Sequence, residues 1–294
     1  MAVTASQVKE LREKTGAGMM DCKNALAATD GDMAKAIDWL REKGIAKSVK
    51  KANRIAAEGL TKVVVSDNKA CLIEVNSETD FVAKNDQFLK LIDDVANTIL
   101  ASDAKTNEEA LALTCGGKSL NDLFVEATAT IGEKIVLRRF ELISKEADEI
   151  FGSYIHMGGK ISALTVVKGG DAQLAKNMAM QVASMSPVYV SSADMPSDVI
   201  EHERTVQTEI AKNDETLANK PEKVLAGIIE GRISKSLKDM CLVDQEYFLD
   251  TGLKCGAVLK NANATVKCFV RYLVGEGLEK KNENFAEEVA KQMA

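Results

Sequence analysis

One stretch, Ile73–Leu91, changes from strand spacing to helix spacing, and it constrains the fold more than any other part of the chain. Apolar and polar side chains alternate up to Asn76, which predicts a strand that ends near this residue. From Phe88 onward the apolar side chains recur at helical spacing. The connection between the two, residues 79–82, reads Thr-Asp-Phe-Val and sets Phe81 among polar residues. Either Phe81 turns inward, or another molecule receives its ring.

The composition is typical of a soluble globular protein, because 46% of the 294 residues are hydrophobic and 28% are charged. This length favours about two domains. The 38 Lys and Arg against 44 Asp and Glu give a net charge of −6, which predicts no sequence-wide attraction to nucleic acid or to an anionic membrane. No apolar run is long enough to span a membrane, and the N-terminus lacks the apolar region of a signal peptide. We therefore expect a cytoplasmic protein with no membrane partner.

Six cysteines are scattered along the chain without any Cys-x-x-Cys pair, which argues against a zinc site and against a disulfide framework. Buried, reduced thiols are the expected state, and we predict neither a metal nor a cofactor. The chain has two histidines, His156 and His202, so histidine-dependent catalysis has few candidates. His156 falls in an expected strand, where a histidine is more often structural or on the surface than a ligand.

Residues 115–119, Cys-Gly-Gly-Lys-Ser, end like a phosphate-binding loop, in which backbone amides and a lysine hold phosphates. The full pattern fails, because its first glycine position is Ala112 and residues 107–113 look helical where a buried strand is needed. A helix C-terminus that ends in Gly-Gly is the better interpretation. No other catalytic motif occurs and no carboxylate pair stands out, so an enzyme is the least favoured class.

Residues 1–54 predict a small three-helix, UBA-like module. Three apolar runs at helical spacing are separated by Thr-Gly-Ala-Gly at 15–18 and by Asp-Gly-Asp at 30–32. Lys and Arg outnumber Asp and Glu here, which gives this segment a net charge of +4. Nucleic-acid binding is therefore one interpretation. A solvated helical face is the better one, because acids are interleaved with the bases and no aromatic platform accompanies them.

A unit of two strands, a helix and a third strand appears twice, first in residues 55–143 and again in residues 144–274. Each copy predicts a three-stranded, largely antiparallel sheet with helices on one face, so we expect an α+β fold. The expected strands are Leu60–Val65, Ala70–Val75 and Ile135–Ile143 in the first copy, and Ser153–Met157, Ile161–Val167 and Thr265–Val274 in the second.

The second copy contains an insertion, residues 197–242, that predicts two antiparallel helices joined by a polar turn. Such a hairpin has little core of its own, so one exposed apolar stripe should meet a partner or a second copy of the chain, which makes a homodimer possible. Residues 275–294 predict a C-terminal module with one more short helix, which packs on the body or reaches a partner.

Three stretches together strongly resemble the bacterial elongation factor Ts family. They are residues 15–23 (Thr-Gly-Ala-Gly-Met-Met-Asp-Cys-Lys), 74–84 (Glu-Val-Asn-Ser-Glu-Thr-Asp-Phe-Val-Ala-Lys) and 274–279 (Val-Gly-Glu-Gly-Leu-Glu). The resemblance covers the whole chain in the family's order of parts. One small departure is Ser77, which stands where the family often has cysteine.

The resemblance implies a nucleotide exchange factor for the GTPase elongation factor Tu, which makes and breaks no bond itself. In the family the Thr-Asp-Phe-Val stretch disturbs the partner's magnesium site, and here that role falls on Thr79, Asp80, Phe81 and Val82. The family's methionine pair helps to dock the N-terminal module on the partner's nucleotide domain, and its histidine in the second half reaches another domain of the partner. The matching residues here are Met19, Met20 and His156.

Two classes of function therefore remain. The first is an exchange factor that acts by binding elongation factor Tu, with no direct contact to nucleic acid. The second is an adaptor or nucleic-acid-associated module that uses the basic N-terminal helices, and strong salt sensitivity would mark such nucleic-acid binding as nonspecific.

Overall fold

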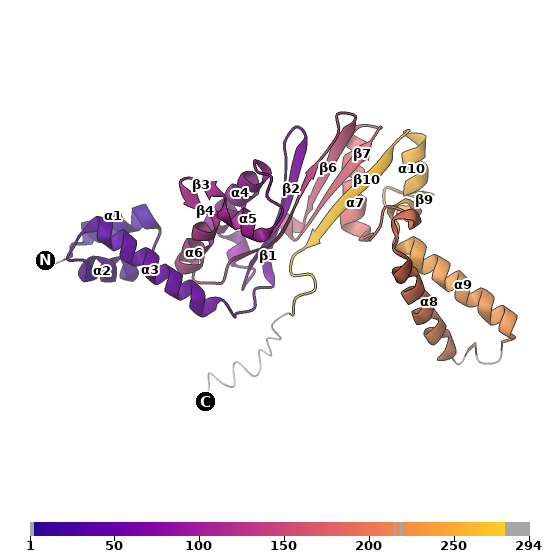
Figure 1. Cartoon of the computed structure of the whole chain (residues 1–294), viewed down its shortest axis with the longest axis horizontal. Helices are drawn as coiled ribbons and strands as arrows, with labels where there is room; N and C mark the ends of the chain where they lie inside the picture. The colour runs from indigo at the N-terminus through magenta and orange to yellow at the C-terminus, as the bar shows by residue number, and fades with distance from the viewer. Residues whose placement is uncertain (1–2, 215, 218–219, 280–294) are drawn as a thin grey trace. The chain divides into compact units, whose positions relative to one another are not determined.

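The computed structural model describes residues 3–214, 216–217 and 220–279, and it has the mixed α+β composition that the sequence predicted (Figure 1). The described residues fall into two units. The first comprises those of Met1–Ile143, Met157–Ile161 and Tyr272–Ala294, and the second comprises those of Ser144–His156 and Ser162–Arg271. None of the helices in the described ranges is long and apolar enough to cross a membrane.

The first unit begins with three packed helices, α1 (Ala5–Thr15), α2 (Met19–Ala28) and α3 (Met33–Lys51). The first has a capping box at its start, and Asp32 caps the third by accepting a hydrogen bond from the Lys35 amide (3.1 Å). The third helix, with 19 residues, is much longer than the first two. The UBA-like assignment stays a prediction. The buried apolar residues of this module are Val8, Leu11, Cys22, Ala25, Leu26 and Ala36.

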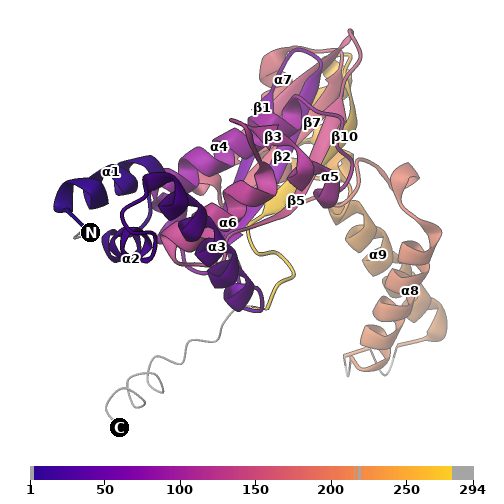
Figure 2. The same ribbon diagram turned by 60° about the vertical axis from the view of Figure 1, so that its left-hand side comes forward.

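A three-stranded sheet forms the centre of the first unit, with β2 (Lys69–Ser77) between β1 (Glu58–Val65) and β5 (Val136–Ser144). The strands β1 and β2 pair antiparallel. Helix α4 (Asp86–Leu100) lies across one face of this sheet in both views (Figures 1 and 2). The apolar stripe of α4 faces the sheet, so side chains from the strands and from the helix pack together in one core. That core includes Cys71, Ile73, Val75, Phe88, Leu91, Ile92, Val95, Ala96 and Ile99.

The connection from α4 to β5 corrects one sequence interpretation. It contains α5 (Asn107–Ala112), β3 (Thr114–Cys115), β4 (Lys118–Ser119) and α6 (Leu120–Ile131). The Gly-Gly pair does not end a helix. It forms the two-residue turn of a β-hairpin, because both glycines adopt positive φ (59° and 84°), as the favoured hairpin turns require.

A second three-stranded sheet has the order β10-β7-β6. Its central strand is β7 (Ile161–Lys168), flanked by β6 (Glu149–His156) and β10 (Thr265–Leu273). This order repeats that of the first sheet, with the second strand of each copy in the middle. Helix α7 (Ala172–Met185) packs against β6. The two elements approach so closely that a Cβ at Gly152 would lie 1.9 Å from the carbonyl oxygen of Ala175, which explains the glycine.

The expected insertion is present as the antiparallel pair α8 (Ser197–Lys212) and α9 (Glu222–Asp239). Sequence patterns missed the segment that follows, which consists of β8 (Glu246–Tyr247), β9 (Asp250–Lys254) and α10 (Cys255–Asn261). All residues of β9 are exposed, so no hydrophobic alternation marks it. The predicted C-terminal helix falls in residues 280–294, outside the described residues.

All six cysteines lie in the described residues as free thiols, and the expected burial holds for four of them. Burial raises the pKa of Cys71 and of Cys255 to about 12, so both thiols stay protonated near neutral pH. The other two, Cys115 and Cys268, are partly buried.

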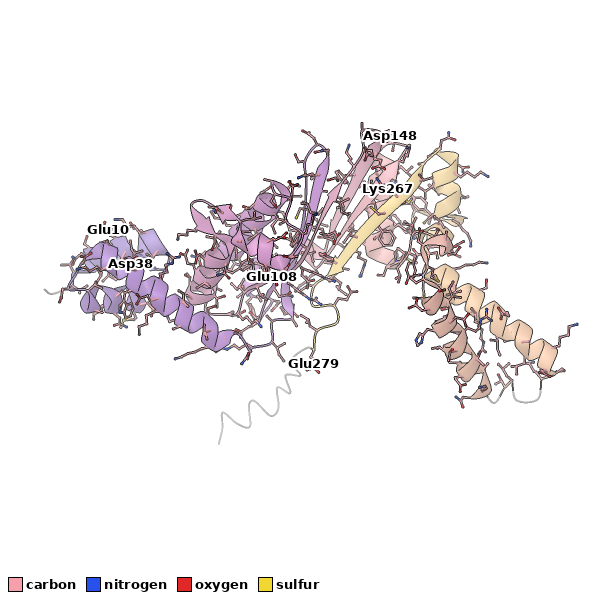
Figure 3. The ribbon with its side chains drawn as sticks, viewed as in Figure 1. Glu10, Asp38, Glu108, Asp148, Lys267 and Glu279 are labelled. Atoms are coloured by element: carbon pink, nitrogen blue, oxygen red, sulfur yellow. The ribbon has the colours of Figure 1, made fainter. Side chains whose placement is uncertain are left out.

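Charged side chains cover the exposed faces of the helices, for example Glu10, Asp38 and Glu108 (Figure 3).

Candidate functional site

The loop that joins β2 to α4 presents an aromatic ring to solvent. The strand ends at Ser77, and a short 3-10 helix, Val82–Lys84, precedes α4. Both Val82 and Ala83 are buried, and Phe81 is 78% exposed. This exposed fraction is the highest among the large apolar side chains of the described residues. Of the two alternatives posed by the sequence, inward or received by another molecule, the structure excludes the inward one.

A carboxylate, that of Asp80, lies next to Phe81 in the chain. Asp80 is exposed, and its carboxylate lies 3.9 Å from the Lys84 ammonium. An exposed ion pair at this distance contributes little to stability, so the Asp80 carboxylate remains able to turn toward another cation. Asn85 then begins α4 by accepting hydrogen bonds from the amides of Gln87 (2.9 Å) and Phe88 (3.3 Å). The helix therefore fixes the far end of the loop.

The near end of the loop is held by a residue that sequence reasoning missed, Glu133. Its Oε2 accepts hydrogen bonds from the backbone amides of Glu78 (3.1 Å) and Thr79 (2.9 Å). Its Oε1 accepts a third from the Thr79 hydroxyl (2.7 Å). In addition, the Ser77 hydroxyl donates to the Thr79 carbonyl (2.9 Å). Thr79 therefore faces the protein, whereas Asp80 and Phe81 face solvent.

A second set of contacts joins the loop to the end of α3. Glu78 accepts from the Lys134 amide (2.6 Å) and pairs with Arg54 (3.3 Å). The Lys134 ammonium donates to the carbonyls of Ala52 (2.7 Å) and Arg54 (3.0 Å). Nearby, Lys51 donates to the Thr128 carbonyl (3.3 Å), and burial lowers the pKa of this lysine. The loop and the N-terminal helices thus share one polar junction.

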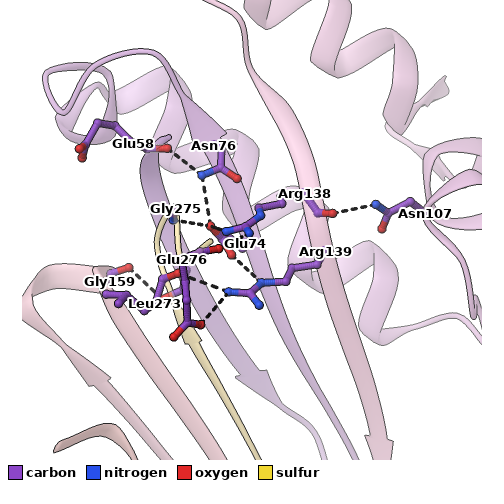
Figure 4. Close-up of polar contacts among 11 residues, drawn as sticks. Glu58, Glu74, Asn76, Asn107, Arg138, Arg139, Gly159, Leu273, Gly275 and Glu276 are labelled. Carbon is purple, nitrogen blue, oxygen red and sulfur yellow. Dashed lines mark hydrogen bonds and ion pairs between the residues drawn. The ribbon is translucent and has the colours of Figure 1, made fainter. Parts of the chain in front are cut away.

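Deeper in the sheet, the completely buried Glu74 anchors β2 (Figure 4). Its carboxylate contacts the guanidinium groups of Arg138 (2.9 Å) and Arg139 (2.6 Å) on β5. It also accepts a hydrogen bond from the Gly275 amide (2.8 Å). Gly275 has φ +70°, and a Cβ there would lie 2.2 Å from the Ala57 carbonyl, so only glycine fits.

The methionine pair lies on another element of the first unit. Met19 and Met20 occupy the first turn of α2, with 58% and 64% of their surfaces exposed. Asp21, the next residue, pairs with Lys47 of α3 (2.9 Å), and Cys22 points into the module's core. The first turn of α2 therefore offers two flexible apolar side chains, which suit adaptable contact surfaces.

His156 belongs to the second unit, where it ends β6. Its ring is partly buried, and its Nδ1 lies 3.1 Å from the Tyr154 hydroxyl. That contact restrains the orientation of the ring.

The described residues contain no group of His, Cys, Asp or Glu that could hold a metal ion.

The first unit thus combines an exposed aromatic ring on a loop held at both ends with two exposed methionines on a helical module. A family model described as Elongation factor TS matches residues 78–276, which is more than half of the chain. The protein therefore belongs to the elongation factor Ts family, whose members are nucleotide exchange factors of translation elongation. The matched range includes Phe81 and His156 and leaves Met19 and Met20 outside.

Proposed function

We propose that the chain binds elongation factor Tu in its GDP-bound state and promotes GDP release by disturbing the magnesium and phosphate site. GTP can then reload the partner during elongation. The observation that carries the proposal is the exposed Phe81 ring, on a backbone that Glu133 holds in place. Membership of the elongation factor Ts family supports the choice of partner.

The physical argument rests on differential binding. A GTPase retains GDP through phosphate contacts and a bound Mg²⁺, so an exchange factor must favour a state in which those contacts are weakened. A phenyl ring inserted between two packed elements must displace one of them, because protein interiors are close-packed. The adjacent Asp80 carboxylate brings negative charge toward a cation site. The coupling is reciprocal, so rebinding of nucleotide expels the factor.

A stopped-flow experiment tests the proposal. Fluorescent GDP bound to elongation factor Tu is mixed with excess unlabelled nucleotide, with increasing amounts of this protein. We expect the release rate to rise with its concentration and to reach a plateau. A release rate that stays at its spontaneous value at every concentration would exclude this function and favour the adaptor.

We assign Met19 and Met20 to docking of the N-terminal module on the partner's nucleotide domain. Replacing both with alanine should weaken binding to nucleotide-free elongation factor Tu by roughly tenfold, equivalent to about 1.4 kcal/mol. Both side chains are exposed, so the fold should be unaffected. Titration calorimetry measures the affinity, and Met185→Ala, another exposed methionine, is the matched control. Equal affinities for all three proteins would remove this docking role.

We also assign His156 to contact with a second domain of the partner, because it ends β6 beside the exposed Met157.

Within unit 2 the helical pair α8–α9 exposes Ile210 and Val224, which suits association with a second copy of the chain. Analytical ultracentrifugation of the free protein distinguishes a homodimer from a monomer.

The adaptor or nucleic-acid alternative has less support. A cavity of about 370 Å³ lies between α3 and α6, and several cations line it. Four of these cations already form ion pairs with nearby carboxylates, which reduces the attraction of this surface for phosphates. The pairs are Lys14 with Glu10, Arg41 with Asp122, Lys47 with Asp21 and Lys118 with Glu126.

A further inference from the structure

We propose that Glu133 is a positioning residue for nucleotide exchange: with Glu78 it forms a reciprocal clamp that fixes the backbone carrying Phe81 before the partner binds. The clamp consists of Glu78, Thr79, Glu133 and Lys134. The Glu133 carboxylate accepts from the backbone amides of Glu78 and Thr79, and the Glu78 carboxylate accepts from the backbone amide of Lys134. Each segment thus binds the backbone of the other. The proposal rests on the exchange function proposed above.

The clamp replaces a missing structural restraint. Glu78 and Thr79 belong neither to β2, which ends at Ser77, nor to the 3-10 helix that starts at Val82. The first helical hydrogen bond of the loop comes only at Phe81, whose carbonyl accepts from the Lys84 amide (3.1 Å). Ordering one residue's backbone costs about 1–2 kcal/mol. A loop that is ordered in the free protein avoids this cost on binding, so more binding energy remains for weakening the nucleotide contacts.

The hydrogen-bond chemistry makes the clamp strong. Bonds from amides to an ionised carboxylate are roughly twice as strong as those between neutral groups. Glu133 accepts three hydrogen bonds from two consecutive residues, which leaves the loop little freedom to rotate. The Lys134 ammonium does not bind these carboxylates and donates instead to carbonyls at the end of α3. The clamp therefore connects the Phe81 loop to the helix that packs against the methionine-bearing α2.

Two variants test the role of Glu133. Glu133→Ala removes all three acceptor contacts, and we expect the maximal rate of GDP release, at saturating exchange factor, to fall about tenfold or more. Glu133→Gln keeps a carbonyl oxygen for the two amides and an amide group near the Thr79 hydroxyl, so it should restore the rate to within about threefold of the wild type. Glu108→Ala, an exposed glutamate on α5, is the matched control and should behave as wild type.

Hydrogen exchange of the free protein supplies a readout that a general loss of stability would not reproduce. In Glu133→Ala the amides of Glu78 and Thr79 should exchange at least about tenfold faster, whereas the amides in the middle of β2 and α4 should keep their protection. If Glu133→Ala does not fold, Glu133→Asp replaces it, because the shorter side chain retains the charge and withdraws the carboxylate from the loop.

The outcomes separate two failures. A normal maximal rate and normal protection of residues 78 and 79 in Glu133→Ala, or in Glu133→Asp if that variant is needed, would overturn the clamp and leave the exchange function intact. Faster hydrogen exchange of amides throughout β2 and α4 would also overturn the clamp, because it would show that Glu133 stabilises the whole unit. If the wild type itself fails to accelerate GDP release, the exchange function is wrong and the positioning role falls with it.

Discussion

Phe81→Ala should slow stimulated release of GDP from elongation factor Tu by about ten- to a hundredfold, since each 1.4 kcal/mol of lost barrier lowering corresponds to tenfold in rate. The ring is 78% exposed in the free protein, so we expect its loss to act on contacts with the partner and not on the core of this protein. Its position between the exposed Asp80 and the buried Val82 directs it outward. Stopped-flow measurement of fluorescent GDP release at saturating exchange factor gives the rate directly.

The fold of the Phe81→Ala variant should be intact, because truncating an exposed side chain usually changes the free energy of unfolding by less than about 0.5 kcal/mol. Urea denaturation checks this. Leu249→Ala, which also truncates an exposed apolar side chain, is the matched control and should release GDP at the wild-type rate. A folded Phe81→Ala variant with full exchange activity would show that the ring does not act as a wedge.

Glu74→Ala should lower the free energy of unfolding by about 3 kcal/mol, because removing one member of a buried ion pair leaves uncompensated charge behind. Here two guanidinium groups and the Gly275 amide lose their acceptor together. The value lies at the low end for buried pairs, since Arg138 and Arg139 are partly exposed and can regain some water. Urea denaturation followed by circular dichroism measures the change.

The control for this prediction is Glu276→Ala. Glu276 is an exposed carboxylate that pairs with Arg139 at 3.5 Å, and removing it should change the free energy of unfolding by less than about 1 kcal/mol. Similar small losses for Glu74→Ala and Glu276→Ala would show that water readily replaces the buried carboxylate. A large loss in the free energy of unfolding for Glu74→Ala, but not for Glu276→Ala, supports the role of Glu74 as the anchor of β2, β5 and Gly275.

Local periodicity was sufficient for most of the regular elements. The alternation that ends near Asn76 and the helical spacing from Phe88 match β2 and α4 closely, because each pattern lies within one element and its burial follows the element's own period. The order of strands and helices in the two copies was also apparent. The Gly-Gly pair at 116–117 was misassigned, since left-handed glycines suit both helix ends and hairpin turns, and here strand pairing decides.

Thus the sequence by itself determined most of the longer elements, the duplicated order of strands and the Thr-Asp-Phe-Val loop between β2 and α4. Only the tertiary structure decided that Phe81 faces solvent and that Glu133 holds its loop. Glu133 and Thr79 are 54 residues apart in the chain, and Glu74 and Gly275 are 201 apart. Hydrogen bonds across such separations depend on how the whole chain packs, so no local spacing of residues signals them.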